Sequence, residues 1–185
     1  MASLINQIII SMPHMQDPYF GRAVVFICEH NKDGALGFIV NKPFETLELQ
    51  DLFSDFFPDD DDILKLVPDV YFGGPVLVER GIVLHSADYE IESTIAIGND
   101  FSLTSNKTII KEIAKKKGPK HSKLMLGHAG WKQYQLEAEI ENGDWLLQHT
   151  NLDFIFNTEE KFMWDMATKS FGINMSEFSG LGGSA

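Results

Sequence analysis

The sequence predicts a mixed α/β (α+β) protein, on the basis of two local patterns and its length. Two β-branched, apolar runs at 23–30 and 35–40 flank Asn31-Lys-Asp-Gly34, whose residue types suit a hairpin turn. Elsewhere apolar residues recur every three to four positions, as along one face of a helix. A length of 185 residues suits one domain. We therefore expect a single domain over 1–178 and a flexible Gly/Ser-rich tail, 179–185, which has little to bury.

The first predicted elements are strands. Residues 7–11 form one strand, and the runs at 23–30 and 35–40 are expected to pair antiparallel. Because both runs are almost continuously apolar, we expect burial on both faces. The segment 46–56 has the apolar spacing of an amphipathic helix.

The middle of the chain is predicted to hold short strands and one helix. The strands are expected at 70–72, 82–85, 94–97 and 101–104. Ser105 is predicted to cap a helix that runs to Lys117, where Gly118-Pro119 ends it. Its buried face would hold Ile109, Ile110, Ile113 and Ala114.

The last third alternates between the two element types. The predicted order is a strand at 124–126, a helix at 133–142, and strands at 145–148 and 152–156. Thr158 is expected to cap a final helix, since Glu159 and Glu160 would favour its first turn. The apolar face of that helix would hold Phe162, Met163 and Met166.

The composition predicts a cytoplasmic protein with no membrane association. The N-terminus lacks the basic start of a secretory leader, and the longest apolar run, 23–28, is too short to span a bilayer. The single cysteine, Cys28, cannot form an internal disulfide, which fits a reducing compartment. Its apolar surroundings favour a buried structural thiol over a nucleophile.

Several sequence blocks together resemble one known family. They are Met12-Pro13, Gln16-Asp17-Pro18, Cys28-Glu29-His30, Gly34-Ala35-Leu36-Gly37, Asn41-Lys42-Pro43, Gly73-Gly74-Pro75-Val76, Gly81 to His85, and Leu126 to Trp131. Gln135-Leu136-Glu137 and Asp144-Trp145-Leu146 continue the pattern. In these blocks the chain resembles the AlgH/YqgE family over nearly its whole length.

The resemblance implies a fold more than a function. It implies a largely antiparallel sheet that bifurcates into a pseudo-barrel with flanking helices. The family is bacterial, with plastid relatives, and its members are compact cytoplasmic proteins of unproven function. Some carry the label of transcriptional regulator, inherited from a genetic link to alginate production. One departure is His128, where the family more often has Tyr.

Charge is unevenly distributed along this acidic chain. The formal net charge is −12, which disfavours contact with nucleic acid and anionic membranes. Residues 107–132 nevertheless hold eight lysines and one acid, a net +7 against −19 elsewhere. The term basic stripe is used below for six of these lysines: Lys111, Lys115, Lys116, Lys117, Lys120 and Lys123. It suits a solvated, dipole-matched helix end, an acidic partner surface, or phosphate contacts. Because it lacks arginines and interleaved aromatics, nucleic acid is the disfavoured partner.

The candidate binding residues come from separate blocks and would need to converge in space. They are Asp17, Asn41, Lys42, Gly73, Gly74, His128 and Trp131. Each has a structural alternative. Asp17 can hold its loop by accepting backbone N–H bonds, and Gly73-Gly74 can be a tight turn rather than an anion cradle.

No catalytic or cofactor signature is present. The sequence lacks a Gly-x-Ser-x-Gly elbow, a Walker motif and a dinucleotide fingerprint. The His14 and Asp17 loop does not have zinc spacing, so neither a metal nor a cofactor is expected. We interpret His85 as a strand residue with satisfied hydrogen bonds.

The leading functional hypothesis is a regulatory or interaction module that binds a small ligand or a protein partner. One alternative is a hydrolase-like enzyme with His128 or His85 as its base. Another is a transcriptional regulator that binds DNA through the basic stripe. The sequence leaves the ligand, the partner and the oligomeric state open.

Overall fold

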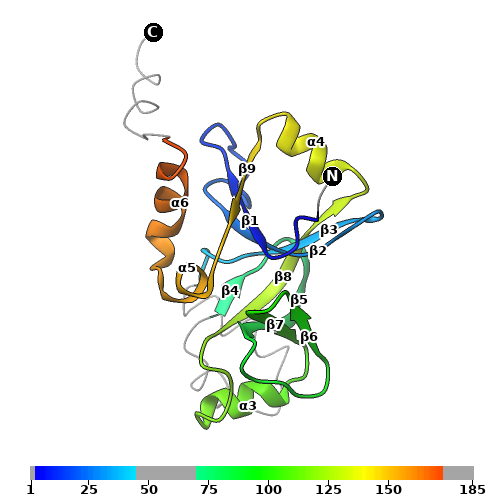
Figure 1. Ribbon diagram of the computed structural model, residues 1–185, viewed down its shortest axis with the longest axis vertical. Coiled ribbons are helices and arrows are strands. Elements are labelled where there is room, and N and C mark those ends of the chain that lie inside the picture. Colours follow the sequence, from blue (N-terminus) through cyan, green and yellow to red (C-terminus); the bar gives the residue numbers. More distant parts are fainter. Residues whose placement is uncertain (1–2, 45–69, 173–185) are drawn as a thin grey trace.

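The structure is a computed structural model that describes residues 3–44 and 70–172 (Figure 1). One sheet dominates it, with nine strands among these residues. The strands are β1 (Gln7–Ser11), β2 (Val24–Asn31), β3 (Gly34–Ile39), β4 (Val70–Phe72), β5 (Val76–Ser86), β6 (Thr94–Ile97), β7 (Phe101–Thr104), β8 (Ser122–Lys132) and β9 (Trp145–His149). The helices are α3 (Thr108–Ala114), α4 (Gln135–Glu141), α5 (Leu152–Asn157) and α6 (Glu160–Lys169). The predicted helix at 46–56 and the tail at 179–185 lie outside the described residues.

The predicted hairpin is confirmed. β2 and β3 pair antiparallel with Val25 opposite Ile39 and Asn31 opposite Gly34, and a bulge lies between Ile27 and Glu29. β1 pairs with β2 on one side and with β9 on the other. Each of these apolar strands therefore lies between two neighbouring strands and not at an edge of the sheet.

The sheet divides at β8, which is much longer than the predicted 124–126. Its C-terminal half pairs with β3, and its N-terminal half pairs with β5 and, in parallel, with β4. Figure 1 shows β8 running between the β5–β7 part of the molecule and the β1–β3 part. The largely antiparallel, bifurcated sheet of an α+β pseudo-barrel with flanking helices is therefore the observed architecture, and the fold class is confirmed.

Both faces of the central strands are buried, as predicted. Ile8 and Phe26 belong to a core covered by α5 and α6, whereas Ile9 and Val25 belong to a second core covered by α4. Successive residues of a strand point to opposite faces, so one continuous apolar run supplies both cores. A smaller cluster packs Ile109 and Ile110 of α3 against β4, β5 and β8.

The largest error in the predicted elements is residues 152–156, which form helix α5 and not a strand. Asn151 stands at the N-cap in extended conformation, and its Oδ1 accepts a hydrogen bond from the N–H of Phe154 at 2.9 Å. A short apolar run suits either element by itself, and here the cap and the packing of Ile155 into the core decide for the helix.

Both caps that the sequence predicted, Ser105 and Thr158, are displaced in the structure. Lys107, not Ser105, is the N-cap of α3 and makes no capping hydrogen bond with its side chain. The side chain of Asn106 accepts the N–H of Thr108, and α3 ends at Ala114 rather than at 117. Thr158 ends α5, so Glu159 is the N-cap of α6.

The buried face of α6 also differs from the prediction. Phe162 and Met166 are about half exposed, whereas Met163, Trp164 and Ala167 are buried. The indole N–H of Trp164 donates to the carbonyl of Ser11 at 2.8 Å, which turns that side chain toward β1.

Candidate functional site

The two glycine blocks meet each other through their backbones. An ideal Cβ on Gly73 would lie 2.3 Å from the carbonyl oxygen of Gly127, and one on Gly74 would lie 2.2 Å from the carbonyl carbon of His128. Gly74 and Gly127 also have φ values of +150° and +70°. Both observations require glycine, so this contact between the β4–β5 turn and β8 is a structural junction.

The Asp17 loop is held from within, in the structural role considered from the sequence. The Asp17 carboxylate accepts the N–H groups of Tyr19 and Phe20 at 2.8 and 2.9 Å. The Nζ of Lys42 then donates to the carbonyl of Tyr19 at 2.6 Å. Burial lowers the pKa of Lys42, and the charge of Asp17 opposes part of that change.

Asn41 ties the end of β3 to β2. Its Oδ1 accepts the N–H of Val24 at 2.8 Å, and its Nδ2 donates to the carbonyl of Arg22 at 2.9 Å. The amide therefore satisfies backbone groups of the loop that precedes β2, and its donor and acceptor are both occupied.

Trp131 lines a hollow of about 320 Å³ that also contains Asp17, Phe20 and Trp145. The indole N–H groups of Trp131 and Trp145 both donate to one oxygen of Glu139, at 2.8 and 2.9 Å. Both tryptophans are at least nine-tenths buried, so their rings present little surface to the hollow.

The candidate binding residues do not line one cavity. Asp17 and Trp131 share the 320 Å³ hollow, and the loop that Asp17 orders is also bound by Lys42. Gly73 and Gly74 form the close backbone contact with β8 described above. His128 lines a different and larger cavity. The binding role of these residues remains a prediction.

The larger cavity has a volume of about 550 Å³ and lies between the two halves of the sheet. Its walls come from β2, β3, β5, β6, β7 and β8. The apolar part of the lining includes Cys28, Leu36, Phe38, Ile82, Ile97 and Leu103. The sequence analysis did not predict these residues as site residues. They come from strands that lie far apart along the chain, and no local spacing in the sequence indicates that the strands meet.

Few polar side chains reach this cavity. Arg80, His128 and Glu29 are among them. Burial lowers the pKa of His128, and the positive charge of Arg80 lowers it further, so the ring is neutral at pH 7. Burial raises the pKa of the Cys28 thiol, which makes that sulfur a poor nucleophile here.

His85 cannot serve as the base of a hydrolase in this conformation. It is fully buried, with Nδ1 2.8 Å from the carbonyl of Ser86 and Nε2 2.8 Å from the hydroxyl of Thr104. Thr94 lies 2.7 Å from the same hydroxyl, so the ring belongs to a closed hydrogen-bond chain. Neither ring nitrogen is available to a substrate, which agrees with the interpretation of His85 as a satisfied strand residue.

We expect His85 to make the protein less stable in mild acid. Burial lowers its pKa, although the Ser86 carbonyl and Asp88 oppose the change. The unfolded chain takes up a proton at His85 as the pH falls through about 6.5, and the folded chain resists it. The melting temperature should therefore fall between pH 7.5 and pH 5.5, and less steeply in His85→Gln. His128→Gln is the control, because the pKa of His128 is also lowered and this variant shows how much that histidine contributes to the pH dependence. If the melting temperature falls equally steeply with pH in the wild-type protein and in His85→Gln, the expectation is contradicted.

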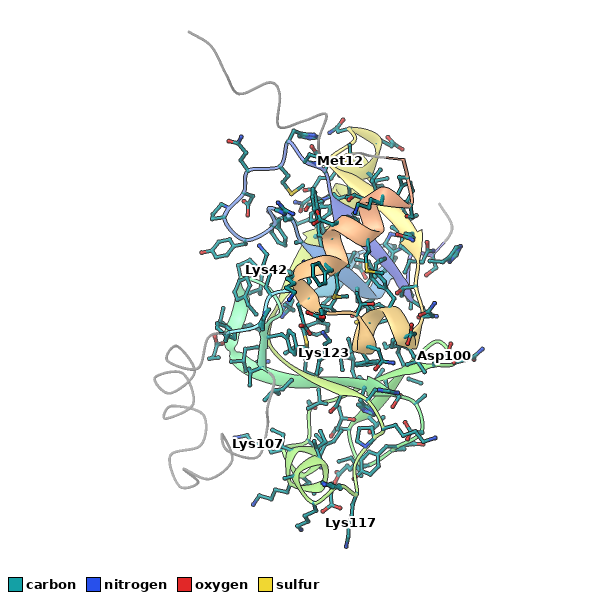
Figure 2. The ribbon with its side chains drawn as sticks, turned by 90° about the vertical axis from the view of Figure 1, so that its left-hand side faces the viewer. Met12, Lys42, Asp100, Lys107, Lys117 and Lys123 are labelled. Atoms are coloured by element: carbon teal, nitrogen blue, oxygen red, sulfur yellow. The ribbon has the colours of Figure 1, made fainter. Side chains whose placement is uncertain are left out.

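The basic stripe loses one member in the structure. Lys123 is not solvated but buried, with its side chain 3% exposed, and its Nζ lies 2.9 Å from Glu160. Figure 2 shows Lys117 projecting away from the molecule beside α3, whereas Lys123 lies near the helices α5 and α6. Lys115 pairs with Glu112 at 3.5 Å. Lys123 lies on strand β8 and contacts Glu160 at the start of α6, so its side chain is buried. Its position in a lysine-rich segment of the sequence does not reveal this contact.

Neither a metal-binding cluster nor a membrane-spanning helix is present in the described part of the chain. Across residues 3–44 and 70–172, no group of three or more His, Cys, Asp and Glu side chains is placed to hold a metal ion. Among the described helices, none combines the length and the apolarity needed to cross a bilayer.

Known proteins resemble this chain over almost all of its length. A family model described as AlgH-like matches residues 8–176. A UPF0301 protein of Jannaschia sp. is 40% identical over 173 residues, which cover 92% of this chain and 90% of the relative. A UPF0301 protein of Pseudoalteromonas translucida is 36% identical over 180 residues, which cover 97% of each chain.

Two solved structures share the fold. The solution structure of the AlgH protein from Pseudomonas aeruginosa has a TM-score of 0.78 at 32% identity, covering 100% of this chain and 97% of that chain. A crystal structure of a Corynebacterium diphtheriae protein has a TM-score of 0.69 at 19% identity, covering 90% of this chain and 86% of that one. The second likeness concerns the fold alone.

Proposed function

This chain belongs to the AlgH-like family, and from the geometry of its larger cavity we propose that it is a non-enzymatic regulatory or interaction module that binds a small, mainly apolar ligand. The observation that carries the proposal is the cavity of about 550 Å³ between the halves of the sheet. Ligand sites in proteins are typically concave, mainly apolar, and supplied with a few polar groups. The proposed compartment is the cytoplasm, in keeping with a single, buried cysteine thiol.

Exposed apolar side chains at the cavity support this assignment. Ile95 is 62% exposed and Leu77 is 41% exposed, and both line the cavity. Leu77 also has a φ of +50°, a conformation that is strained for leucine, and it lies where the pairing of β5 with β8 shifts. A small ligand that covers these side chains would remove their apolar surface from water, which favours binding.

The enzyme alternative is less well supported by the same geometry. His85 is closed within its own hydrogen bonds, and the lining thiol of Cys28 has a raised pKa. His128 is the histidine that lines the cavity, and it supports either a base or a hydrogen-bonding group for a ligand. We favour binding because the cavity is mainly apolar.

Binding of the neutral dye Nile red tests this proposal. We expect fluorescence enhancement with the wild-type protein, and a loss of at least tenfold in affinity in Ile95→Asp, which places a charge at the cavity. Leu36→Trp, which fills the cavity from β3, should weaken binding as well. Ile95 is exposed, so its substitution should leave the fold intact.

Phe162→Asp is the matched control, because Phe162 is a 48% exposed apolar residue on α6, outside the residues that line the cavity. It should bind the dye as the wild-type protein does. Equal loss in Ile95→Asp and Phe162→Asp, or no loss in either, would show that the dye binds elsewhere and would overturn the proposal.

A further inference from the structure

The charged groups at the cavity differ in how far they are already satisfied. The carboxylate of Glu29 accepts a hydrogen bond from the side chain of Asn31 at 2.6 Å. Within the described part of the chain, Arg80 forms no ion pair, although its side chain is exposed beside the cavity. The structure therefore leaves a cation next to an apolar space.

The position of Arg80 follows from the irregular start of β5. Val76 pairs with His128 and Gly81 pairs with Leu126, so residues 77–80 bridge a shift in the register. This irregularity interrupts the ladder, as a β-bulge does, and re-aims the side chains that follow. Leu77 and Arg80 both line the cavity as a result.

His128 adds a neutral hydrogen-bonding group to the same space. It lies close enough to Arg80 for the guanidinium charge to affect its titration. A neutral imidazole offers one N–H donor without a second charge. The planar guanidinium fork of an arginine can supply two parallel N–H donors to one carboxylate, and both Arg80 and His128 line this cavity.

We propose that the ligand of this cavity is an amphipathic carboxylate, with its apolar tail among the lining side chains and its carboxylate on Arg80. The inference rests on the proposed function, since it names the chemical class for the same cavity. The formal net charge of −12 opposes the approach of an anion. At physiological ionic strength that opposition is screened beyond about 8 Å, whereas a direct contact with Arg80 is shorter than this distance.

The test compares eight-carbon probes that differ only at the head: octanoate, 1-octanol and octylamine, titrated calorimetrically at pH 7.5. We expect octanoate to bind about tenfold more tightly than octanol, the gain typical of one charged hydrogen-bonded contact, and octylamine to bind most weakly. Arg80→Leu should remove the preference for octanoate and leave the affinity for octanol unchanged. Arg80→Lys should restore part of it, because lysine keeps the charge without the planar fork.

Glu29→Gln is the matched control, since it changes the other charged residue at the cavity and should keep or increase the affinity for octanoate. Equal affinities for octanoate and octanol, or a preference for octanoate that survives in Arg80→Leu, would overturn the inference while the proposed apolar site stands. If none of the three probes binds and Nile red also fails, the proposed function falls together with the inference.

Discussion

Replacing Gly74 with alanine should lower the free energy of unfolding by about 3 kcal/mol or more. The added Cβ would lie 2.2 Å from the carbonyl carbon of His128 and 2.4 Å from the nitrogen of Ala129, and these are backbone atoms that cannot turn aside. The φ of +150° is also unfavourable for any residue with a Cβ. Either the β4–β5 turn or β8 must therefore shift, and β8 joins the two halves of the sheet.

Gly130→Ala is the matched control for this substitution. Gly130 lies on the same strand, β8, and an ideal Cβ there meets no atom within 4 Å. Its substitution should change the free energy of unfolding by no more than about 0.5 kcal/mol. Urea unfolding of the wild-type protein, Gly74→Ala and Gly130→Ala measures the difference in the free energy of unfolding. Similar unfolding midpoints for the two variants would contradict the close contact at Gly74.

Replacing Lys123 with methionine should lower the free energy of unfolding by about 2–4 kcal/mol, because it removes the buried partner of an ion pair whose glutamate is 29% exposed. The Nζ donates to the carbonyl of Val40 at 3.0 Å and to Glu160 at 2.9 Å, and it lies 4.1 Å from the ring centroid of Tyr71. Tyr71 donates to the same Glu160 oxygen at 2.7 Å. Burial raises the pKa of Glu160, but the hydrogen bonds from Lys123 and Tyr71 outweigh it and keep that pKa below its ordinary value.

The double variant Lys123→Met/Glu160→Gln separates the ion pair from the packing. Once the lysine is absent, neutralising Glu160 should cost little or restore part of the stability, since the carboxylate no longer has its cationic partner. Lys117→Met is the control from the exposed end of the basic stripe and should change the midpoint of urea unfolding little. Equal effects of Lys123→Met and Lys117→Met would contradict the burial of Lys123.

The basic stripe has consequences for the transcriptional-regulator hypothesis. Lys123 is occupied by Val40 and Glu160, and Lys115 pairs with Glu112. The lysines that remain exposed on α3 and in the following loop can make few simultaneous phosphate contacts, and each contact adds salt-sensitive affinity only. DNA binding therefore stays the disfavoured expectation for a chain with a formal net charge of −12.

Features that depend only on neighbouring residues could be predicted from the amino-acid sequence. The turn chemistry of 31–34 specified the β2–β3 hairpin, and the continuous apolarity of β2 specified burial on both faces. The short Asp17 side chain reaches N–H groups two and three residues away, so its loop-holding role could be inferred from local geometry. Each of these interactions or patterns involves residues close together in the sequence, so it can be predicted without knowing the fold.

Features that depend on contacts between distant segments of the chain could not be predicted in this way. Residues 152–157 have an apolar run that suits either element, and packing on the core made them a helix. Lys123 looks like any lysine of its segment, and only its position beneath α6 pairs it with Glu160. The cavity beside Arg80 and His128 combines residues from six strands. Because the pairing of those strands brings them together across long separations, no spacing within a single segment could encode it.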